Sequence, residues 1–307
     1  MKGTHSVRFT KMHGIGNDYV YVNGFEERVS DPQALAGRIA DRHTGVGADG
    51  LILVLPPETG VEAHVRMTMF NADGSRAEMC GNGIRCVCKL AHDHGLLNGD
   101  ANPMRVQTDI GVLSLEYTTD AAGRVDQVTV DMGEPILEPA DIPVRIADLD
   151  RIINHSIRTL FDWPPSPAPN WEQDCGLDHR MTCVSMGNPH AVFYCDDVEE
   201  VPLETVGPAL ENHKVFPNRV NVHFVQIRSR GEIRMRTWER GSGLTRACGT
   251  GASAVCVAGV LTDRTDRQLQ AHLPGGDLLL EWKCRNNHVY MTGPATEVFR
   301  GDWPDSS

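Results

Sequence analysis

One phrase occurs twice in this 307-residue chain. Around the first cysteine of interest the chain reads Phe70-Asn-Ala-Asp-Gly-Ser-Arg-Ala-Glu-Met-Cys80-Gly-Asn-Gly83, and around the second it reads Trp238-Glu-Arg-Gly-Ser-Gly-Leu-Thr-Arg-Ala-Cys248-Gly-Thr-Gly251. Each copy has an aromatic residue ten positions before the cysteine and a polar residue nine before. Each Cys-Gly-x-Gly then opens an apolar stretch. Two matched thiols indicate a reaction with one acid or base on each face of a substrate.

Two further blocks repeat in the same order. The segment Met12-His-Gly-Ile-Gly-Asn17 resembles Ser185-Met-Gly-Asn188, and the segment beginning at Gly45 resembles the one beginning at Phe216. Three matched blocks in order indicate duplication of one domain. We therefore expect two halves, residues 1–131 and 132–293, with residues 294–307 returning to the first half.

Composition excludes several classes of function. The net charge of −12 argues against a nucleic-acid or anionic-membrane partner. No apolar run is long enough to span a bilayer, and the N-terminal residues lack the apolar core of a signal peptide. Nine cysteines without a framework spacing predict reduced thiols in the cytoplasm. The sequence leaves the oligomeric state open, and a homodimer is the assembly we consider.

Hydrophobic patterning predicts an α/β (α+β) chain. Short apolar or alternating runs predict strands at 7–10, 19–23, 51–55, 65–70, 112–117 and 125–132, and at 181–185, 191–194, 220–226, 233–238, 277–282 and 289–292. Helices are expected at 31–42, 83–94, 203–212 and 251–262. We expect each half to be a mainly antiparallel sheet wrapped around a central helix, rather than a doubly wound sheet. A Pro-rich loop at 162–171 is assigned no chemistry.

The Cys-Gly-x-Gly motif has a physical rationale. Small residues let the chain turn sharply from a loop into a helix. The first helical N–H groups and the helix dipole then attract an anion and lower the pKa of a neighbouring thiol. A carboxylate held there would have a thiol beside its α-carbon. A thiolate on one face could remove the α-proton while a thiol on the other face returns one, without pyridoxal phosphate.

The remaining cysteine and glycine patterns do not predict a functional site. Cys86, Cys88 and Cys256 lie in apolar helical runs and are interpreted as core residues. We expect no metal site, because no second cysteine pair accompanies Cys86 and Cys88 at ligand spacing. The Gly45-x-Gly-x-x-Gly50 pattern precedes a strand instead of following one, so we reject a dinucleotide site.

Taken together, several motifs resemble the diaminopimelate epimerase family. They are Phe9-Thr-Lys-Met-His-Gly-Ile-Gly-Asn-Asp18, Cys80-Gly-Asn-Gly-Ile-Arg-Cys86, Ser185-Met-Gly-Asn-Pro-His190, Phe216-Pro-Asn-Arg-Val-Asn221, Trp238-Glu-Arg240 and Ala247-Cys-Gly-Thr-Gly-Ala252. The resemblance covers nearly the whole chain. It implies a pseudo-twofold fold with the site in the cleft between halves, and cofactor-independent interconversion of LL- and meso-diaminopimelate in lysine and peptidoglycan synthesis.

The resemblance also implies residue roles. Cys80 and Cys248 match the catalytic thiols, Glu239 a carboxylate near the reacting ammonium, and His190 a histidine that assists the thiols. The helix-start residues Gly81, Asn82, Gly249 and Thr250 match the amides that hold the reacting carboxylate. Asn17, Asn71, Asn188, Asn221 and Arg240 match the polar residues that bind the rest of the substrate.

One position departs from the pattern. Some family members have a glutamine that reaches the substrate where this chain has Gly50, the repeat counterpart of Asn221. Two alternatives therefore stay open at this point. One is a two-cysteine racemase for another amino acid, and the other is a redox-regulated thiol protein in which Cys80 and Cys248 form a disulfide.

Overall fold

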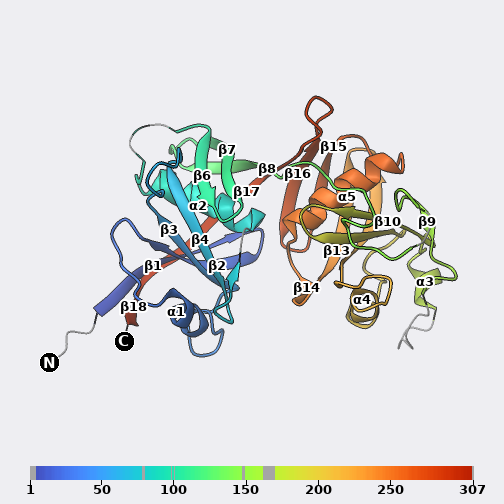
Figure 1. The fold of residues 1–307 in the computed structure, drawn as a ribbon, viewed down its shortest axis with the longest axis horizontal. Coiled ribbons are helices and arrows are strands. Elements are labelled where there is room, and N and C mark those ends of the chain that lie inside the picture. Colours follow the sequence, from blue (N-terminus) through green and yellow to red (C-terminus); the bar gives the residue numbers. More distant parts are fainter. Residues whose placement is uncertain are drawn as a thin grey trace. The chain divides into compact units, whose positions relative to one another are not determined.

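A computed structural model describes residues 5–77, 80–97, 99, 101–146, 149–161 and 170–305. The chain divides into two compact units (Figure 1). Unit 1 contains residues 1–131 and 292–307, and unit 2 contains residues 132–291. None of the helices in the described residues combines the length and apolarity that crossing a bilayer requires.

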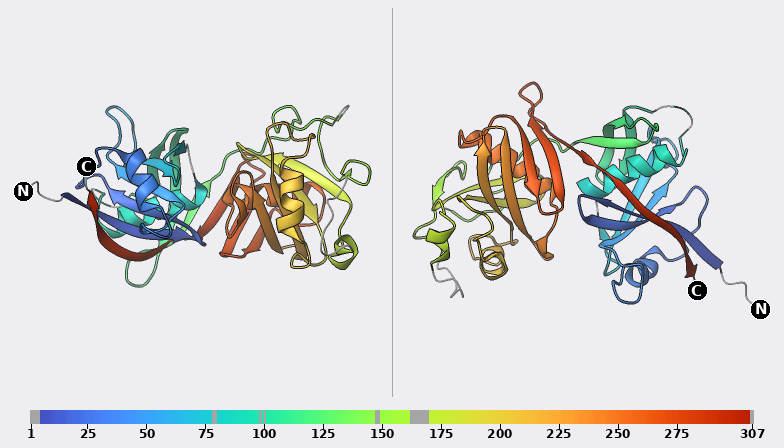
Figure 2. Two further views of the ribbon diagram at one scale, coloured as in Figure 1. Left: turned by 90° about the horizontal axis from the view of Figure 1, so that it is seen from below. Right: turned by 180° about the vertical axis from the view of Figure 1, so that it is seen from behind.

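Unit 1 is built on one strongly bent sheet with the strand order β18-β1-β2-β3-β4-β6-β7-β8. The β2–β3 and β4–β6 pairs are parallel and the others are antiparallel, and the short β5 pairs with β4. Figure 2 shows β18, near the C-terminus, running beside β1. The strands are β1 His5–Gly14, β2 Asn17–Asn23, β3 Gly50–Leu55, β4 Val65–Asn71, β5 Arg76–Ala77, β6 Met104–Thr108, β7 Gly111–Thr119, β8 Val125–Asp131 and β18 Thr296–Asp305.

Unit 2 repeats this topology. Its strand order is β9-β10-β11-β12-β13-β15-β16, with the parallel pairs β11–β12 and β13–β15 at the matching places. The short β14 pairs with β13 as β5 does with β4. The strands are β9 His155–Ser156, β10 Arg180–Ser185, β11 Pro189–Tyr194, β12 Asn221–Ser229, β13 Glu232–Glu239, β14 Gly243–Thr245, β15 Gln268–Leu273, β16 Gly276–Trp282 and β17 Val289–Pro294, the last of which contains the unit boundary.

A central helix lies inside the curve of each sheet. In unit 1, α2 (Gly81–Asp93) packs against strands on several sides, and in unit 2, α5 (Gly249–Leu261) does the same. Almost every residue of α5 is buried, which explains why its sequence is apolar all round rather than amphipathic. The remaining helices are α1 (Pro32–Ile39), α3 (Trp171–Asp174) and α4 (Leu203–Glu211).

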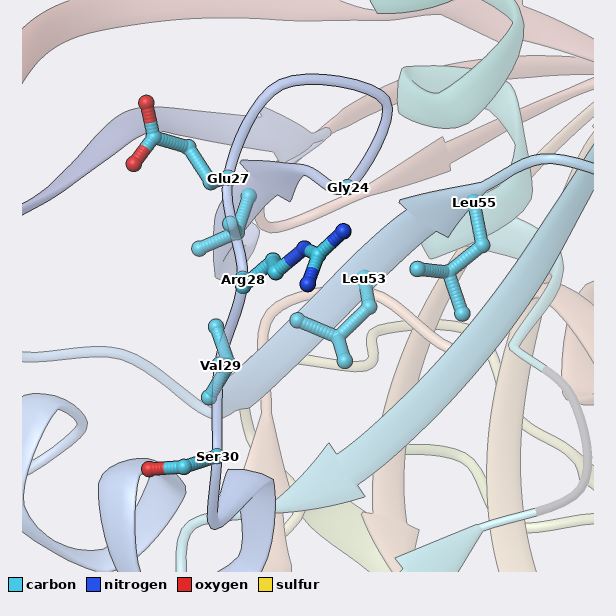
Figure 3. A pocket seen from close by; sticks show the side chains of 8 residues that line it. Gly24, Glu27, Arg28, Val29, Ser30, Leu53 and Leu55 are labelled. Atoms are coloured by element: carbon cyan, nitrogen blue, oxygen red, sulfur yellow. The ribbon is translucent and has the colours of Figure 1, made fainter.

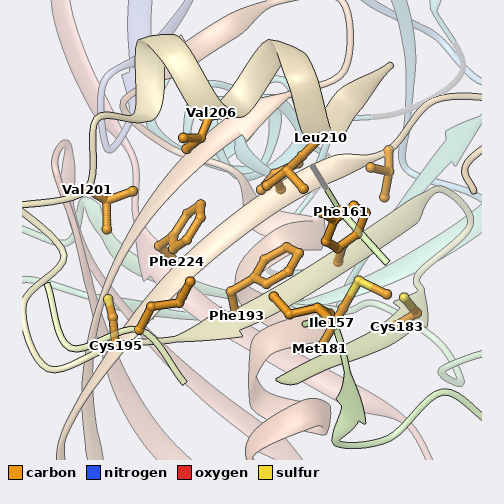
Figure 4. Close-up of a cluster of buried hydrophobic side chains, with 14 of the residues drawn as sticks. Ile157, Phe161, Met181, Cys183, Phe193, Cys195, Val201, Val206, Leu210 and Phe224 are labelled. Carbon is orange, nitrogen blue, oxygen red and sulfur yellow. The ribbon is translucent and has the colours of Figure 1, made fainter. Parts of the chain in front are cut away.

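A separate apolar cluster covers the other side of each sheet. In unit 2, α4 lies over strands β12 and β13, and its Val206 and Leu210 point toward Phe193 and Phe224 (Figure 4). The rings of Phe193 and Phe224 stack with their centroids 5.3 Å apart. In unit 1, α1 packs Leu35 against the sheet in the same way. The central strands β2, β3 and β11 are therefore buried on both faces, whereas β7 and β15 alternate buried and exposed residues.

The predicted fold class is confirmed, and the differences are local. The central helices begin at Gly81 and Gly249, two residues before the predicted starts, so each begins directly after its cysteine. The helix expected at 31–42 ends at Ile39. Sequence patterns did not predict α3 or the strands β5, β6, β9, β14, β15 and β18. Most of the predicted Pro-rich loop, residues 162–169, lies outside the described residues.

Candidate active site

The two repeated cysteines cap the two central helices. Cys80 precedes α2 with φ −136° and ψ 118°, and Cys248 precedes α5 with φ −133° and ψ 100°. Both residues are therefore N-caps in extended conformation, a backbone geometry typical of that position. The following small residues let each thiol lie beside the first free N–H groups of its helix. The duplicated sequence thus produces a duplicated local geometry.

In unit 1 the thiol of Cys80 lies against the β1–β2 hairpin. Its sulfur accepts a hydrogen bond from the Gly83 amide at 3.4 Å and lies 3.2 Å from Asn17 Oδ1. Asn17 in turn donates from Nδ2 to Asp49 Oδ2 at 2.7 Å. That bond fixes the amide so that its carbonyl oxygen, rather than its NH₂ group, faces the sulfur.

The hairpin is shaped to bring Asn17 to the start of α2. A Cβ on Gly14 would lie 2.9 Å from the Asn82 carbonyl oxygen, so only glycine allows this close approach. The turn itself contains Ile15 at φ 48°, a region that β-branched residues rarely adopt. Such backbone strain costs about 1–3 kcal/mol and is commonly found at functional sites.

Three residues that the sequence analysis did not select also belong to this part of the site. Tyr19 is 5% exposed, and burial, together with the neighbouring Cys80 and Asp49, raises the pKa of its phenol. Asp49 holds Asn17, as described above. Arg85 is fully buried on α2, and its guanidinium donates to the carbonyl oxygens of Gly81 and Pro294. Tyr19 could have been found from sequence, because it is the repeat counterpart of His190.

The other predicted residues of unit 1 are placed as follows. Asn82 is buried at the start of α2, and its Oδ1 has no hydrogen-bond partner in the part of the chain that the structure describes. The side chain of Asn71 donates to Ser75 Oγ at 3.0 Å. Gly50 pairs with Asn71, and a Cβ on Gly50 would lie 2.1 Å from the Phe70 carbonyl oxygen. The Phe70 carbonyl oxygen therefore leaves no room for a side chain at residue 50.

In unit 2 the thiol of Cys248 is 3% exposed. Burial raises its pKa well above the usual value, and the charge of Glu239 raises it further. Hydrogen bonds from the Gly251 amide and Thr250 act in the opposite direction. The expectation that the helix start would bring this pKa down toward neutrality is therefore wrong for Cys248, because desolvation of the thiolate outweighs the helix amides. Cys248 is a protonated thiol at neutral pH.

His190 is completely buried in β11, which begins two residues before the strand predicted at 191–194. Its Nε2 lies 2.8 Å from Asn188 Oδ1, and its Nδ1 lies 2.9 Å from His223 Nε2. Asn188 donates from Nδ2 to Thr250 Oγ1 at 3.3 Å. The side chains of Asn188, His190 and Thr250 are thus brought together beside Cys248. His223 was missed, although it lies two residues after Asn221 on one strand and so shares its face.

Asn221, Glu239 and Arg240 also meet in unit 2. Asn221 is buried, accepts a hydrogen bond from the Arg240 amide at 3.0 Å and donates to the Pro189 carbonyl oxygen at 2.9 Å. Glu239 accepts a hydrogen bond from Thr245 Oγ1 at 2.6 Å. The Arg240 side chain is exposed and donates to the Asn218 carbonyl oxygen at 3.1 Å. Asn221 is a structural anchor of the strand ends as well as a predicted binding residue.

A separate apolar pocket lies in unit 1 and contains none of the predicted site residues (Figure 3). Its volume is about 470 Å³, and it lies between β2, β3 and the segment that precedes α1. Within the described residues, no group of three or more His, Cys, Asp or Glu side chains could hold a metal ion.

Comparison with known proteins identifies the family. Residues 9–138 and 182–298 match the family model described as diaminopimelate epimerase. The chain belongs to this family. A diaminopimelate epimerase from Acetivibrio thermocellus is 50% identical over 96% of this chain and 98% of its own. One from Agathobacter rectalis is 51% identical over 96% of this chain and 99% of its own.

The fold extends beyond the diaminopimelate epimerase family. The crystal structure of a PhzF-family phenazine biosynthesis protein from Bacillus anthracis matches 97% of this chain and 99% of its own with a TM-score of 0.68. The sequence identity is 16%, so this likeness shows the two-domain fold alone.

Proposed function

We propose that this protein interconverts LL- and meso-2,6-diaminopimelate, an isomerase reaction that proceeds without pyridoxal phosphate. The observation that carries the proposal is the pair of helix-capping thiols, Cys80 and Cys248, in a chain about 50% identical to diaminopimelate epimerases. Lysine and peptidoglycan synthesis in the cytoplasm is the setting we propose for it. A homodimer is the assembly we propose.

The two thiols act on opposite faces of the α-carbon. A thiolate takes the α-proton, the electron pair of the broken C–H bond stays on the carbon, and the other thiol gives its proton to the opposite face. Configuration is thereby inverted, and the two sulfurs exchange protonation states. The raised pKa of Cys248 favours its protonated form, which is the form that a proton donor needs.

The helix starts stabilise the charge that develops. The amides of Gly81 and Asn82, and of Gly249 and Thr250, have no partners within their helices and are proposed to hold the reacting carboxylate. Negative charge grows on this carboxylate as the α-proton leaves, so the same donors bind the transition state more tightly than the substrate. Glu239 is proposed to bind the reacting ammonium, and His190 to assist the thiols.

The distal amino-acid group gives specificity. We assign its recognition to Asn17, Asn71, Asn188, Asn221 and Arg240, whose amide and guanidinium groups match a carboxylate and an ammonium. A substrate with two charged ends that leaves water needs each charge to be paired. Because a Cβ on Gly50 would collide with the Phe70 carbonyl oxygen, we propose that the main chain of unit 1, rather than a side chain at residue 50, faces that part of the substrate.

Solvent proton exchange tests the proposal. Purified protein in heavy water, incubated with a panel of amino acids, should exchange the α-proton of diaminopimelate and epimerise it, while Cys80→Ala and Cys248→Ala should each abolish epimerisation. Full turnover by either variant would contradict the two-thiol mechanism. Faster exchange of alanine, proline or histidine than of diaminopimelate would contradict the substrate.

A further inference from the structure

A chain of polar side chains runs through unit 2 and ends at the sulfur of Cys248. Thr237 Oγ1 lies 2.9 Å from His223 Nδ1, His223 Nε2 lies 2.9 Å from His190 Nδ1, and His190 Nε2 lies 2.8 Å from Asn188 Oδ1. Asn188 then bonds Thr250, whose Oγ1 is 3.8 Å from Cys248 Sγ. We propose that Thr237 and His223 are positioning residues that fix the direction of this chain, so that Thr250 donates its hydroxyl hydrogen to the catalytic sulfur.

Both histidines in the chain are neutral. Each is fully buried, and burial lowers the pKa of His223 to about 3 and that of His190 well below its usual value. The neighbouring His223 and Arg240 lower the pKa of His190 further. A neutral imidazole has one N–H donor and one bare acceptor nitrogen. Each ring must therefore donate on one side and accept on the other, and the chain can run in only two directions.

Thr237 decides between the two directions. Thr237 is only 3% exposed, and within the described residues the partner of its hydroxyl is His223 Nδ1. If His223 donated from Nδ1, the buried Thr237 hydrogen would have no acceptor, which costs about 1–3 kcal/mol. With Thr237 as the donor, His223 donates from Nε2 to His190, and His190 donates from Nε2 to Asn188 Oδ1. Every hydrogen in the chain then has an acceptor.

Asn188 and Thr250 continue the same donor-to-acceptor direction from His190 to the thiol of Cys248. Because Asn188 uses its oxygen to accept from His190, its NH₂ group faces Thr250 and donates to Oγ1. The Thr250 hydrogen is then free to point at Cys248. Together with the Gly251 amide it stabilises the thiolate against burial and against the carboxylate of Glu239, which both favour the protonated form. Arg240 acts electrostatically on His190, and Glu239 acts on Cys248.

The His223 ring is built into the helix start. A Cβ on Gly251 would lie 2.3 Å from His223 Cε1 and 3.0 Å from Cys248 Sγ, so the ring packs directly under the first turn of α5. The second glycine of Cys-Gly-Thr-Gly therefore leaves room for the ring.

Unit 1 lacks this arrangement in its described residues. Leu51 pairs with Phe70 and Ile52 with Met69 in unit 1, as Val222 pairs with Trp238 and His223 with Thr237 in unit 2. Ile52 is therefore the counterpart of His223, and Met69 is the counterpart of Thr237. Both counterparts are buried apolar residues. Cys80 instead has Asn17 and Tyr19 beside it. The duplicated fold therefore gives its two thiols different surroundings, and the relay of hydrogen bonds described above leads to Cys248.

Matched threonine variants test the relay. Thr237→Val removes the first donor at nearly constant shape, while Thr237→Ser keeps it. The control is Thr182→Val, which removes a buried hydroxyl of unit 2 that bonds the Asn154 amide outside the relay. The measurement is the rate at which iodoacetamide labels Cys248, resolved by peptide mapping and followed against pH. Cys80 in the same samples is the internal reference.

Loss of one hydrogen bond to a charged group should shift the Cys248 labelling profile upward by about one pH unit. Below the midpoint of the labelling profile, iodoacetamide should label Cys248 about tenfold more slowly in Thr237→Val than in wild type. The labelling rates in Thr237→Ser and Thr182→Val should match wild type. In the wild-type protein, ¹⁵N-edited NMR should show His190 and His223 both as the Nε2–H tautomer. An unshifted labelling profile or an Nδ1–H tautomer would overturn the inference, and the NMR result decides it if Thr237→Val fails to fold.

The inference deepens the proposed function, but its test is separate. Labelling and NMR need no substrate, so a protein that fails to epimerise diaminopimelate would refute the proposed function while the relay is still tested. In an active enzyme, Thr237→Val should also move the alkaline limb of the kcat/KM profile by the same interval, and Thr237→Ser should restore it.

Discussion

Replacing the second glycine of each Cys-Gly-x-Gly motif with alanine distinguishes an effect on packing from an effect on the reaction. The two positions, Gly83 and Gly251, occupy the same place in matched helices. A Cβ on Gly83 would lie 2.8 Å from Ile52 Cδ1, and its next contact would be at 3.4 Å. A Cβ on Gly251 would lie 2.3 Å from His223 Cε1 and 2.9 Å from Nε2 of the same ring. The added methyl group would therefore contact a flexible methyl of Ile52 in unit 1. In unit 2 it would contact the His223 ring, which is held by two hydrogen bonds.

The structure gives the size of the difference. Alanine gains up to about 1 kcal/mol of helix propensity at either site. Shifting the terminal methyl of Ile52 costs about 0.5–1.5 kcal/mol, so Gly83→Ala should stay within about 1 kcal/mol of wild type. Moving His223 breaks its hydrogen bonds to His190 and Thr237, at about 0.5–1.5 kcal/mol each, and adds overpacking of about 1–3 kcal/mol. Gly251→Ala should therefore be less stable than Gly83→Ala by about 2–3 kcal/mol.

Urea unfolding of both variants measures this difference as a change in midpoint at constant slope. Epimerisation kinetics of the same samples should show the larger loss of kcat in Gly251→Ala, because the displaced ring belongs to the relay behind Cys248. Equal stability and equal activity of the two variants would refute the close packing of His223 under α5.

Three further outcomes are expected. If Arg240 binds the distal carboxylate, Arg240→Met should lower kcat/KM for diaminopimelate, with a loss of transition-state stabilisation of about 3 kcal/mol or more. A variant with wild-type kinetics would exclude that role. Stability should fall at alkaline pH: burial raises the pKa of Cys86 to about 11 and that of Cys256 to about 12, whereas an unfolded thiol ionises near ~8.5. The unfolded chain releases these protons first, so each thiol should cost about 2 kcal/mol at pH ~10. Replacing both with alanine or serine should flatten the pH dependence of the urea midpoint between pH ~8.5 and ~10. Mild oxidation should inactivate the enzyme reversibly by joining Cys80 to Cys248, with substrate protecting; finding both thiols free in the inactive protein would contradict it.

Much of the site follows from local sequence patterns. The duplicated motifs located both thiols, aligned Asn17 with Asn188 and Gly50 with Asn221, and indicated a fold of two related halves. The strand pairing reproduces that alignment, since Leu51 pairs with Phe70 in unit 1 as Val222 pairs with Trp238 in unit 2. Local patterns succeed here because a helix start, a turn glycine and an alternating strand are each specified by neighbouring residues. The strands β6 and β15 were missed because each is short and has only two or three apolar residues at alternate positions, although each pairs with the next strand along the chain.

The sequence by itself determined the repeat, the two helix-capping cysteines and the family. The tertiary structure alone decided how each thiol behaves. The expected lowering of the Cys248 pKa was wrong because the helix amides that favour a thiolate are local, whereas the burial that opposes them comes from strands far along the chain. The link from Thr237 through His223 to His190 likewise joins residues on three strands. Desolvation and hydrogen-bond direction depend on which distant groups surround an atom, so only the folded chain fixes them.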